Sequence, residues 1–205
     1  MLAFHLMLLV LLAGISGAAA QELGPISRHM ILHIVIMGVL APLAAILFMY
    51  LERGRQGGKA KSRLLTATVL QLVTFVLWHT PAFMATAMRD LSVTLAMQVT
   101  LLAVSLNFWI QVLRMNRRKP WLCAASLMVS GKVFCLLAAV MLFAPQPAFH
   151  GGHIGVAATS LHDQQTAGLI MLAVCPLIYV ISGIVLIARW FLASCRLNAS
   201  PLGVS

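Results

Sequence analysis

The stretch WLCAASLMVSGKVFCLLAAVMLFA, residues 121–144, contains a single charged residue, Lys132, in an otherwise almost entirely apolar sequence. An α-helix needs about 20 such residues to cross the roughly 30 Å hydrocarbon core of a membrane. In that core the backbone must satisfy its own hydrogen bonds, which a helix does within one segment. Residues 121–144 therefore predict a transmembrane helix.

Four further stretches meet the same criterion, at residues 30–50, 64–84, 92–113 and 166–188. The 205-residue chain is 61% hydrophobic and 9% charged, with a mean hydropathy of +0.99, whereas a soluble domain is roughly one-quarter charged. We therefore predict an all-α fold, a polytopic transmembrane helical bundle of five spans. This bundle forms one domain, residues 21–193, without an internal repeat.

Residues 1–20 have the pattern of a signal peptide. A short apolar core from Leu6 to Leu12 is followed by Ala18-Ala19-Ala20, which fits an A-x-A cleavage site. No Lys or Arg precedes the core, so an uncleaved extra span is the alternative. Either arrangement leaves the later spans in the same orientation.

The positions of the basic residues, which give the chain its net charge of +10, indicate how it is oriented in the membrane. Residues 52–63 contain five basic residues and residues 114–119 contain four. Because Lys and Arg concentrate in cytoplasmic loops, we predict that both loops are cytoplasmic. The mature N-terminus then lies outside, and the tail, residues 194–205, lies in the cytoplasm. A charge distributed in this way predicts a lipid bilayer, and no nucleic acid, as the partner.

All histidines except His5, which lies in the leader, fall at the non-cytoplasmic side of this topology. They are His29, His33, His79, His150, His153 and His162. A solvated or interfacial position explains any one of them equally well. Six on one side, however, indicate a shared role such as metal binding.

His29 and His33 are the first candidate metal ligands. They are four residues apart, so they lie on one face of a helix, and Met37 continues that face one turn deeper. Imidazole and thioether groups suit copper, since soft sulfur ligands favour Cu(I). Met30, Met37 and Met171 are also explained as ordinary packing residues.

His79 is the third candidate ligand, in the sequence Trp78-His79-Thr80-Pro81. Proline interrupts the hydrogen-bond ladder of the span here. An interfacial tryptophan beside a kink is the alternative explanation. We predict that His79 lies level with His29 and His33 when the spans pack side by side.

The outer connection supplies weaker candidates. His150 and His153 flank two glycines and form a candidate metal-recruitment loop. His162 precedes Asp163 at the start of the last span, where a carboxylate caps a helix. Asp163 is therefore either such a cap or a residue that supports the metal site by orienting a histidine.

Lys132 is the only charged residue deep within a span, and at that depth it costs at least ~2.5–3.5 kcal/mol. We expect it to avoid lipid and to contact Gln71, Thr74, Asn107 or backbone carbonyls, with a snorkelling side chain as the alternative. The four cysteines show no CxxC spacing and are interpreted as small apolar residues.

Three segments together resemble a known family. They are RHMILH (28–33) with APL (41–43) after it, LWHTP (77–81) and DQQTAGLIM (163–171). In this order they are similar to the multi-span CtaG family of cytochrome c oxidase assembly factors, of which this chain would be a short member. The family pattern leads us to expect a histidine in the third span, near where this chain has Gln98.

The resemblance implies a non-enzymatic protein of the bacterial cytoplasmic membrane that assists oxidase assembly through copper handling at its outer side. Its partners would be oxidase subunits or other assembly factors. The metal ligands would be His29, His33 and His79, supported by Met37, Asp163, Met171 and His162.

Two other functions remain open from the residues alone. His33 and His79 could ligate haem b from neighbouring spans. A metal-ion transporter is the last candidate, based on the intramembrane polar residues Lys132, Gln71 and Asn107.

Overall fold

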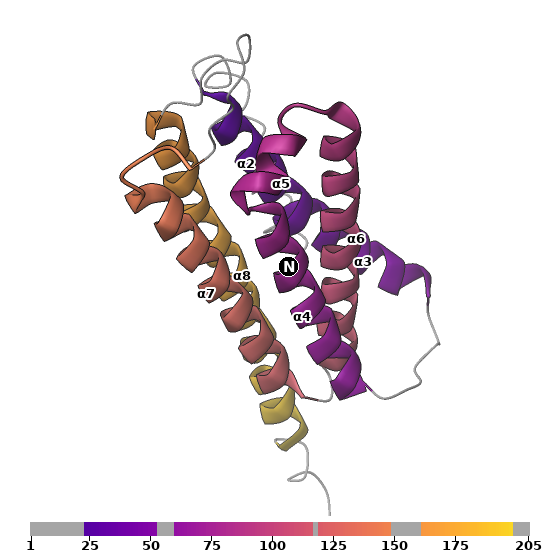
Figure 1. Ribbon diagram of the computed structural model, residues 1–205. Helices are drawn as coiled ribbons and strands as arrows, with labels where there is room; N and C mark the ends of the chain where they lie inside the picture. The colour runs from indigo at the N-terminus through magenta and orange to yellow at the C-terminus, as the bar shows by residue number, and fades with distance from the viewer. Residues whose placement is uncertain (1–22, 53–59, 117–118, 149–160, 199–205) are drawn as a thin grey trace, which may run out of the picture.

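The computed structural model describes residues 23–52, 60–116, 119–148 and 161–198 (Figure 1), and within these residues the regular structure is helical without any strand. The predicted leader, residues 1–20, and the loop histidines His150 and His153 lie outside the described residues. The helices are α2 (Pro25–Val35), the π-helix η1 (Ile36–Leu40), α3 (Ala41–Leu51), α4 (Ala60–Trp78), α5 (Pro81–Ala87), α6 (Leu91–Asn116), α7 (Pro120–Phe143) and α8 (Leu161–Asn198).

Four helical segments among the described residues are long and apolar enough to cross a membrane. They are Pro25–Leu51, Leu91–Asn116, Pro120–Phe143 and Leu161–Cys195. A fifth is added when Arg63–Trp78 and Pro81–Ala87, which meet at 73°, are counted as one broken span. The predicted fold class, an all-α multi-pass bundle, is therefore confirmed.

Neighbouring helices run in alternating directions. In Figure 1, α4 and α7 run toward the upper end of the bundle, while α6 and α8 run away from it. The start of α2, the end of α4 and the start of α8 consequently share that end. α2 packs on α8, whereas α3 packs on α6, so the first span crosses from one side of the bundle to the other.

α7 and α8 share the most extensive contact of the described helix pairs, and Gly168 shows why they can approach. A Cβ atom on Gly168 would lie 2.9 Å from both the Ala138 carbonyl oxygen and the Leu142 nitrogen of α7. Small residues let helix backbones approach closely within a membrane. Gly168 therefore sets how closely the N-terminal half of α8 sits against α7.

The π-helix η1 follows from Pro42. Proline has no N–H, and its ring clashes with the carbonyl four residues earlier, here that of Gly38. The helix widens instead, and the Ala41 N–H donates to the carbonyl of Ile36, five residues back. Trp109 of α6 supports the widened turn, because its indole N–H donates to the Met37 carbonyl at 3.1 Å.

A second proline breaks the span that the sequence predicts over residues 64–84. Pro81 cannot donate to the carbonyl of Leu77, and both the backbone N–H and the hydroxyl of Thr80 donate there instead, at 3.1 and 2.9 Å. α4 ends at Trp78 and α5 leaves at 73°. His79 therefore lies at the turn, at the end of α4.

Candidate metal site

Three histidine side chains, two from α2 and one from the turn after α4, come together at the shared end of the bundle. The rings of His29 and His33 on α2 have centroids 4.4 Å apart, and those of His33 and His79 are 5.3 Å apart. His33 is 2% exposed and His79 is 4% exposed, while His29 is partly buried. The packing of α2 beside the end of α4 thus brings together the residues that the sequence singled out.

Several nitrogens of these rings are buried without a hydrogen-bond partner among the described residues. They are Nε2 of His29, both ring nitrogens of His33 and Nε2 of His79. Buried polar atoms are normally paired, and an unpaired one costs about 1–3 kcal/mol. Such a cluster indicates a site whose partner is a ligand rather than the protein itself.

His79 is held in one tautomer. Its Nδ1 lies 2.7 Å from the Phe75 carbonyl oxygen, and a carbonyl only accepts, so Nδ1–H is the donor. The lone pair is therefore on Nε2. Metal-binding histidines are commonly oriented by such a bond from the other ring nitrogen to a backbone carbonyl.

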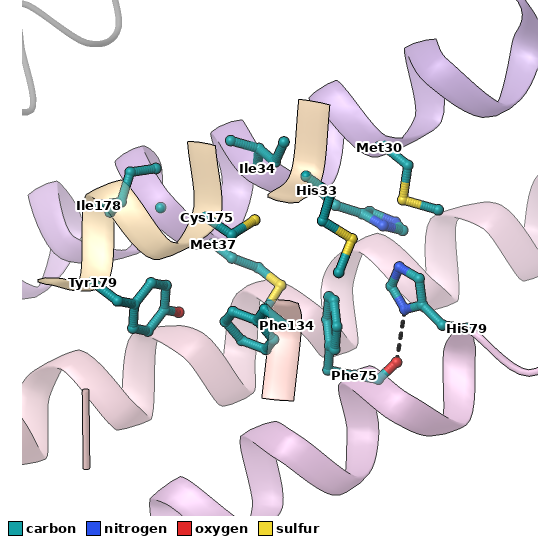
Figure 2. Close-up of a pocket in the computed structure, with 12 residues that line it drawn as sticks. Met30, His33, Ile34, Met37, Phe75, His79, Phe134, Cys175, Ile178 and Tyr179 are labelled. Atoms are coloured by element: carbon teal, nitrogen blue, oxygen red, sulfur yellow. Dashed lines mark hydrogen bonds between the residues drawn. The ribbon is translucent and has the colours of Figure 1, made fainter. Parts of the chain in front are cut away.

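His33 and His79 line a small, mostly apolar cavity between α2, α4, α7 and α8 (Figure 2). Its volume is about 20 Å³, enough for one water molecule or one ion of similar size. Four sulfur-containing side chains also line it, namely Met30, Met37, Met171 and Cys175.

The spacing of these residues explains how they reach one cavity. Met30, His33 and Met37 fall at i, i+3 and i+7 and so share one face of the first span. Met171 and Cys175, four residues apart, share a face of α8. Met37 and Met171 were predicted as supporting residues, whereas Met30 and Cys175 were interpreted as packing residues, because an apolar helix face has the same spacing.

Aromatic rings close the cavity on its inner side. Tyr179 packs against Phe134 with ring centroids 5.1 Å apart, and Phe134 packs against Phe75 at 4.4 Å. The Tyr179 hydroxyl accepts a hydrogen bond from Nε2 of Gln71 at 2.7 Å. Gln71 therefore holds the Tyr179 ring in place without lining the cavity itself.

Asp163 lies in the first turn of α8, but its carboxylate caps α2. One carboxylate oxygen accepts from the Ile26 N–H at 2.8 Å, and the other accepts from the N–H and hydroxyl of Ser27 at 3.1 and 2.6 Å. A Cβ atom on Gly24 would lie only 2.2 Å from the Asp163 carboxyl carbon. Asp163 thus ties the start of α2 to α8 and supports the histidines by positioning their helix.

Other predicted site residues lie away from the cavity. His162 is exposed at the start of α8. Gln98 is partly buried on α6 and does not line the cavity, and both polar atoms of its side-chain amide lack a partner in the described part of the chain.

Lys132 is not buried within the bundle, as the expected contact with Gln71, Thr74 or Asn107 would require. Lys132 lies on the exposed face of α7, while Gln71 is buried against Tyr179. Asn107 is exposed on α6 and accepts a hydrogen bond from Gln111 at 3.3 Å. The three intramembrane polar residues therefore form no common cluster, because they occupy different faces of different helices.

The available donors limit what the cavity can bind. Within the described ranges, no three His, Cys, Asp or Glu side chains are arranged to hold a metal ion together. An ion bonded to two imidazoles at about 2.0–2.1 Å lies roughly 3 Å from each ring centre, which the 5.3 Å between His33 and His79 permits. Sulfur atoms would have to complete its ligand set.

A known protein family matches most of the chain. Residues 53–193 match the family described as cytochrome c oxidase caa3 assembly factor, Caa3_CtaG. The match covers α4 to α8, with His79, Asp163, Met171 and Cys175, whereas His29 and His33 precede it. No curated protein and no solved structure gives a match.

Proposed function

Because the chain belongs to the family of cytochrome c oxidase caa3 assembly factors, we propose that it assists oxidase assembly by binding copper in the cavity between His33 and His79. Haem-copper oxidases need copper delivered to their catalytic core, so copper is the cargo in this proposal. The protein acts as a carrier or chaperone and not as an enzyme.

One observation carries the proposal: buried imidazole nitrogens without partners among the described residues lie at a small, mostly apolar cavity that four sulfur-containing side chains also line. The His79 Nε2 atom has the lone pair that a metal requires, and His33 can offer either nitrogen. Thioether and thiol groups favour Cu(I), and imidazole binds copper in either oxidation state. A soft, monovalent ion also needs less charge compensation in a site within a membrane.

The site belongs at the outer side of the cytoplasmic membrane in this proposal. The start of α4, the end of α6 and the start of α7, which border the basic segments at residues 52–63 and 114–119 in sequence, lie at the opposite end of the bundle from the histidines (Figure 1). The positive-inside rule assigns those loops to the cytoplasm. The cavity would then receive copper from the non-cytoplasmic side, where oxidase subunits or other assembly factors could exchange it.

Haem b between His33 and His79 is the less favoured alternative. A cavity of about 20 Å³ accommodates a single ion but leaves no room for a porphyrin. Reduced, detergent-extracted protein would show a Soret band and a sharp α-band if haem were bound.

Copper titration of the purified protein tests the site. We expect about one Cu(I) per chain in anaerobic competition with a chromophoric chelator, and loss of that binding in the His33→Ala His79→Ala double variant. His162→Ala is the matched control, because His162 is exposed and outside the cavity. Stoichiometric binding that survives the double substitution would show that this assignment is wrong.

The assembly role is tested in cells. Deleting the protein should lower cytochrome c oxidase activity, and added copper should restore part of it if copper supply is the missing step. The double variant should behave like the deletion, and His162→Ala should restore normal activity. A deletion without effect on oxidase activity would contradict the proposed function.

A further inference from the structure

Lys132 is exposed near the midpoint of a membrane-spanning helix. α7 runs from Pro120 to Phe143, 24 residues, or about 36 Å at 1.5 Å per residue. Lys132 lies halfway along it, on the face that is turned away from the bundle. The hydrocarbon core leaves roughly 15 Å between the midplane and either interface, more than the four-carbon stem of lysine can span.

The same face of α7 carries a continuous apolar stripe. Its large apolar members, 51–77% exposed, are Trp121, Val129, Leu136, Val140 and Phe143. Together with the exposed Ala125 and Lys132 they recur every three or four residues. This spacing is that of one helix surface. In the isolated chain the ammonium group of Lys132 is therefore surrounded by apolar side chains and lipid.

The chain itself offers no carboxylate to Lys132 among the described residues. Glu52 pairs with Arg114, Asp90 accepts hydrogen bonds from Ser92, and Asp163 caps α2. All three carboxylates lie at or near helix ends, far from the middle of α7. A charge at the centre of a membrane span normally faces an opposite charge or a polar cavity.

We propose that the stripe of α7 centred on Lys132 is a docking surface for a transmembrane helix of another protein, one that carries an Asp or Glu at the same depth. Charge complementarity selects this occupant. The apolar stripe supplies packing area on both sides of the ion pair, and the low dielectric of the membrane strengthens the pair itself. The proposal does not depend on copper binding.

A second copy of the chain does not fit this surface. Two-fold pairing through the same face would place Lys132 opposite the Lys132 of its partner, and like charges repel. A head-to-tail contact would require a carboxylate exposed at mid-depth, which the described helices do not present.

Site-specific photo-crosslinking in native membranes tests the proposal. Benzoylphenylalanine in place of Leu136, one turn from Lys132, should give an adduct with a membrane protein whose transmembrane helix contains an acidic residue. Lys132→Leu should lower the adduct yield by about tenfold or more, because it leaves the partner's carboxylate unpaired. Lys132→Arg and Val129→Leu should retain the yield.

A charge exchange completes the test. Lys132→Glu should abolish the adduct, and replacing the partner's acidic residue with lysine should restore it. The purified Lys132→Leu protein should unfold at the same temperature as the unsubstituted chain, which separates lost docking from lost folding. Adducts with lipid or a second copy only, no adduct at all, or an undiminished yield in Lys132→Leu would overturn the proposal.

Discussion

Replacing Asp163 with alanine should release the start of α2 from α8. In the native chain the Asp163 carboxylate accepts three hydrogen bonds from α2, two from the backbone N–H groups of Ile26 and Ser27 and one from the Ser27 hydroxyl. These groups belong to the first turn of α2, which has no helix partner for its N–H groups. His29 and His33 follow within the next two turns.

The size of the effect follows from burial. Asp163→Ala leaves two backbone N–H groups without their acceptor in a buried setting, and each such loss costs about 1–3 kcal/mol. We therefore expect the free energy of unfolding to fall by roughly 2–6 kcal/mol. For a chain of this size that corresponds to a drop in melting temperature of at least about 5 °C.

Asp90→Ala is the matched control. The Asp90 carboxylate also accepts hydrogen bonds from a backbone N–H and a serine hydroxyl, both from Ser92 and both at 2.7 Å. Asp90 is exposed, so water replaces the lost acceptor and the effect should be small. Thermal unfolding in detergent compares the two variants, and amide hydrogen exchange locates the loosened segment.

The expected exchange pattern is specific. Asp163→Ala should raise exchange in the first turns of α2 well above that in α7, and it should lower copper affinity because His33 moves with α2. Equal melting temperatures for Asp163→Ala and Asp90→Ala, or unchanged exchange in α2, would refute the reasoning.

Three further outcomes are expected. Gly168→Ala should cost about 1–3 kcal/mol, because its methyl group meets the backbone of α7. The methyl group of Gly183→Ala meets only side-chain methyl groups, the nearer of them on Met128 at 3.3 Å; equal shifts of the two variants in detergent unfolding would contradict this. Pro81→Ala should reduce the 73° bend and weaken Cu(I) affinity by about tenfold or more, and a chelator titration with unchanged affinity would rule that out. Hydrogen bonds from Ser92 hold the pKa of Asp90 below its ordinary value, so the stability that Asp90 adds is present at neutral pH and is lost as the pH falls through its folded-state pKa. Melting curves of Asp90→Ala and the unsubstituted chain should therefore converge only in acid.

Membrane-spanning helices are predictable from this sequence because each apolar segment satisfies its backbone hydrogen bonds locally. The prolines also mark irregular points, since a missing N–H is a local property. The widened turn at η1 depends on Trp109 of α6 as well as on Pro42, and such a contact between distant segments is not visible in local sequence.

The candidate site was only partly predictable. His29 and His33 share a helix face by spacing alone, but Met30 and Cys175 look like packing residues until α2 and α8 are placed around one cavity. Asp163 carries the signature of a helix cap, yet the sequence does not say which helix it caps.

The sequence by itself determined the all-α multi-pass architecture and the choice of histidines, because hydropathy and helical periodicity act over short distances. Only the tertiary structure decided that His33 meets His79, that four sulfur-containing side chains line the same cavity, and that Lys132 faces outward. The physical reason is the same in each case: helix–helix packing sets the rotation and depth of each span, and those depend on contacts between residues far apart in the chain.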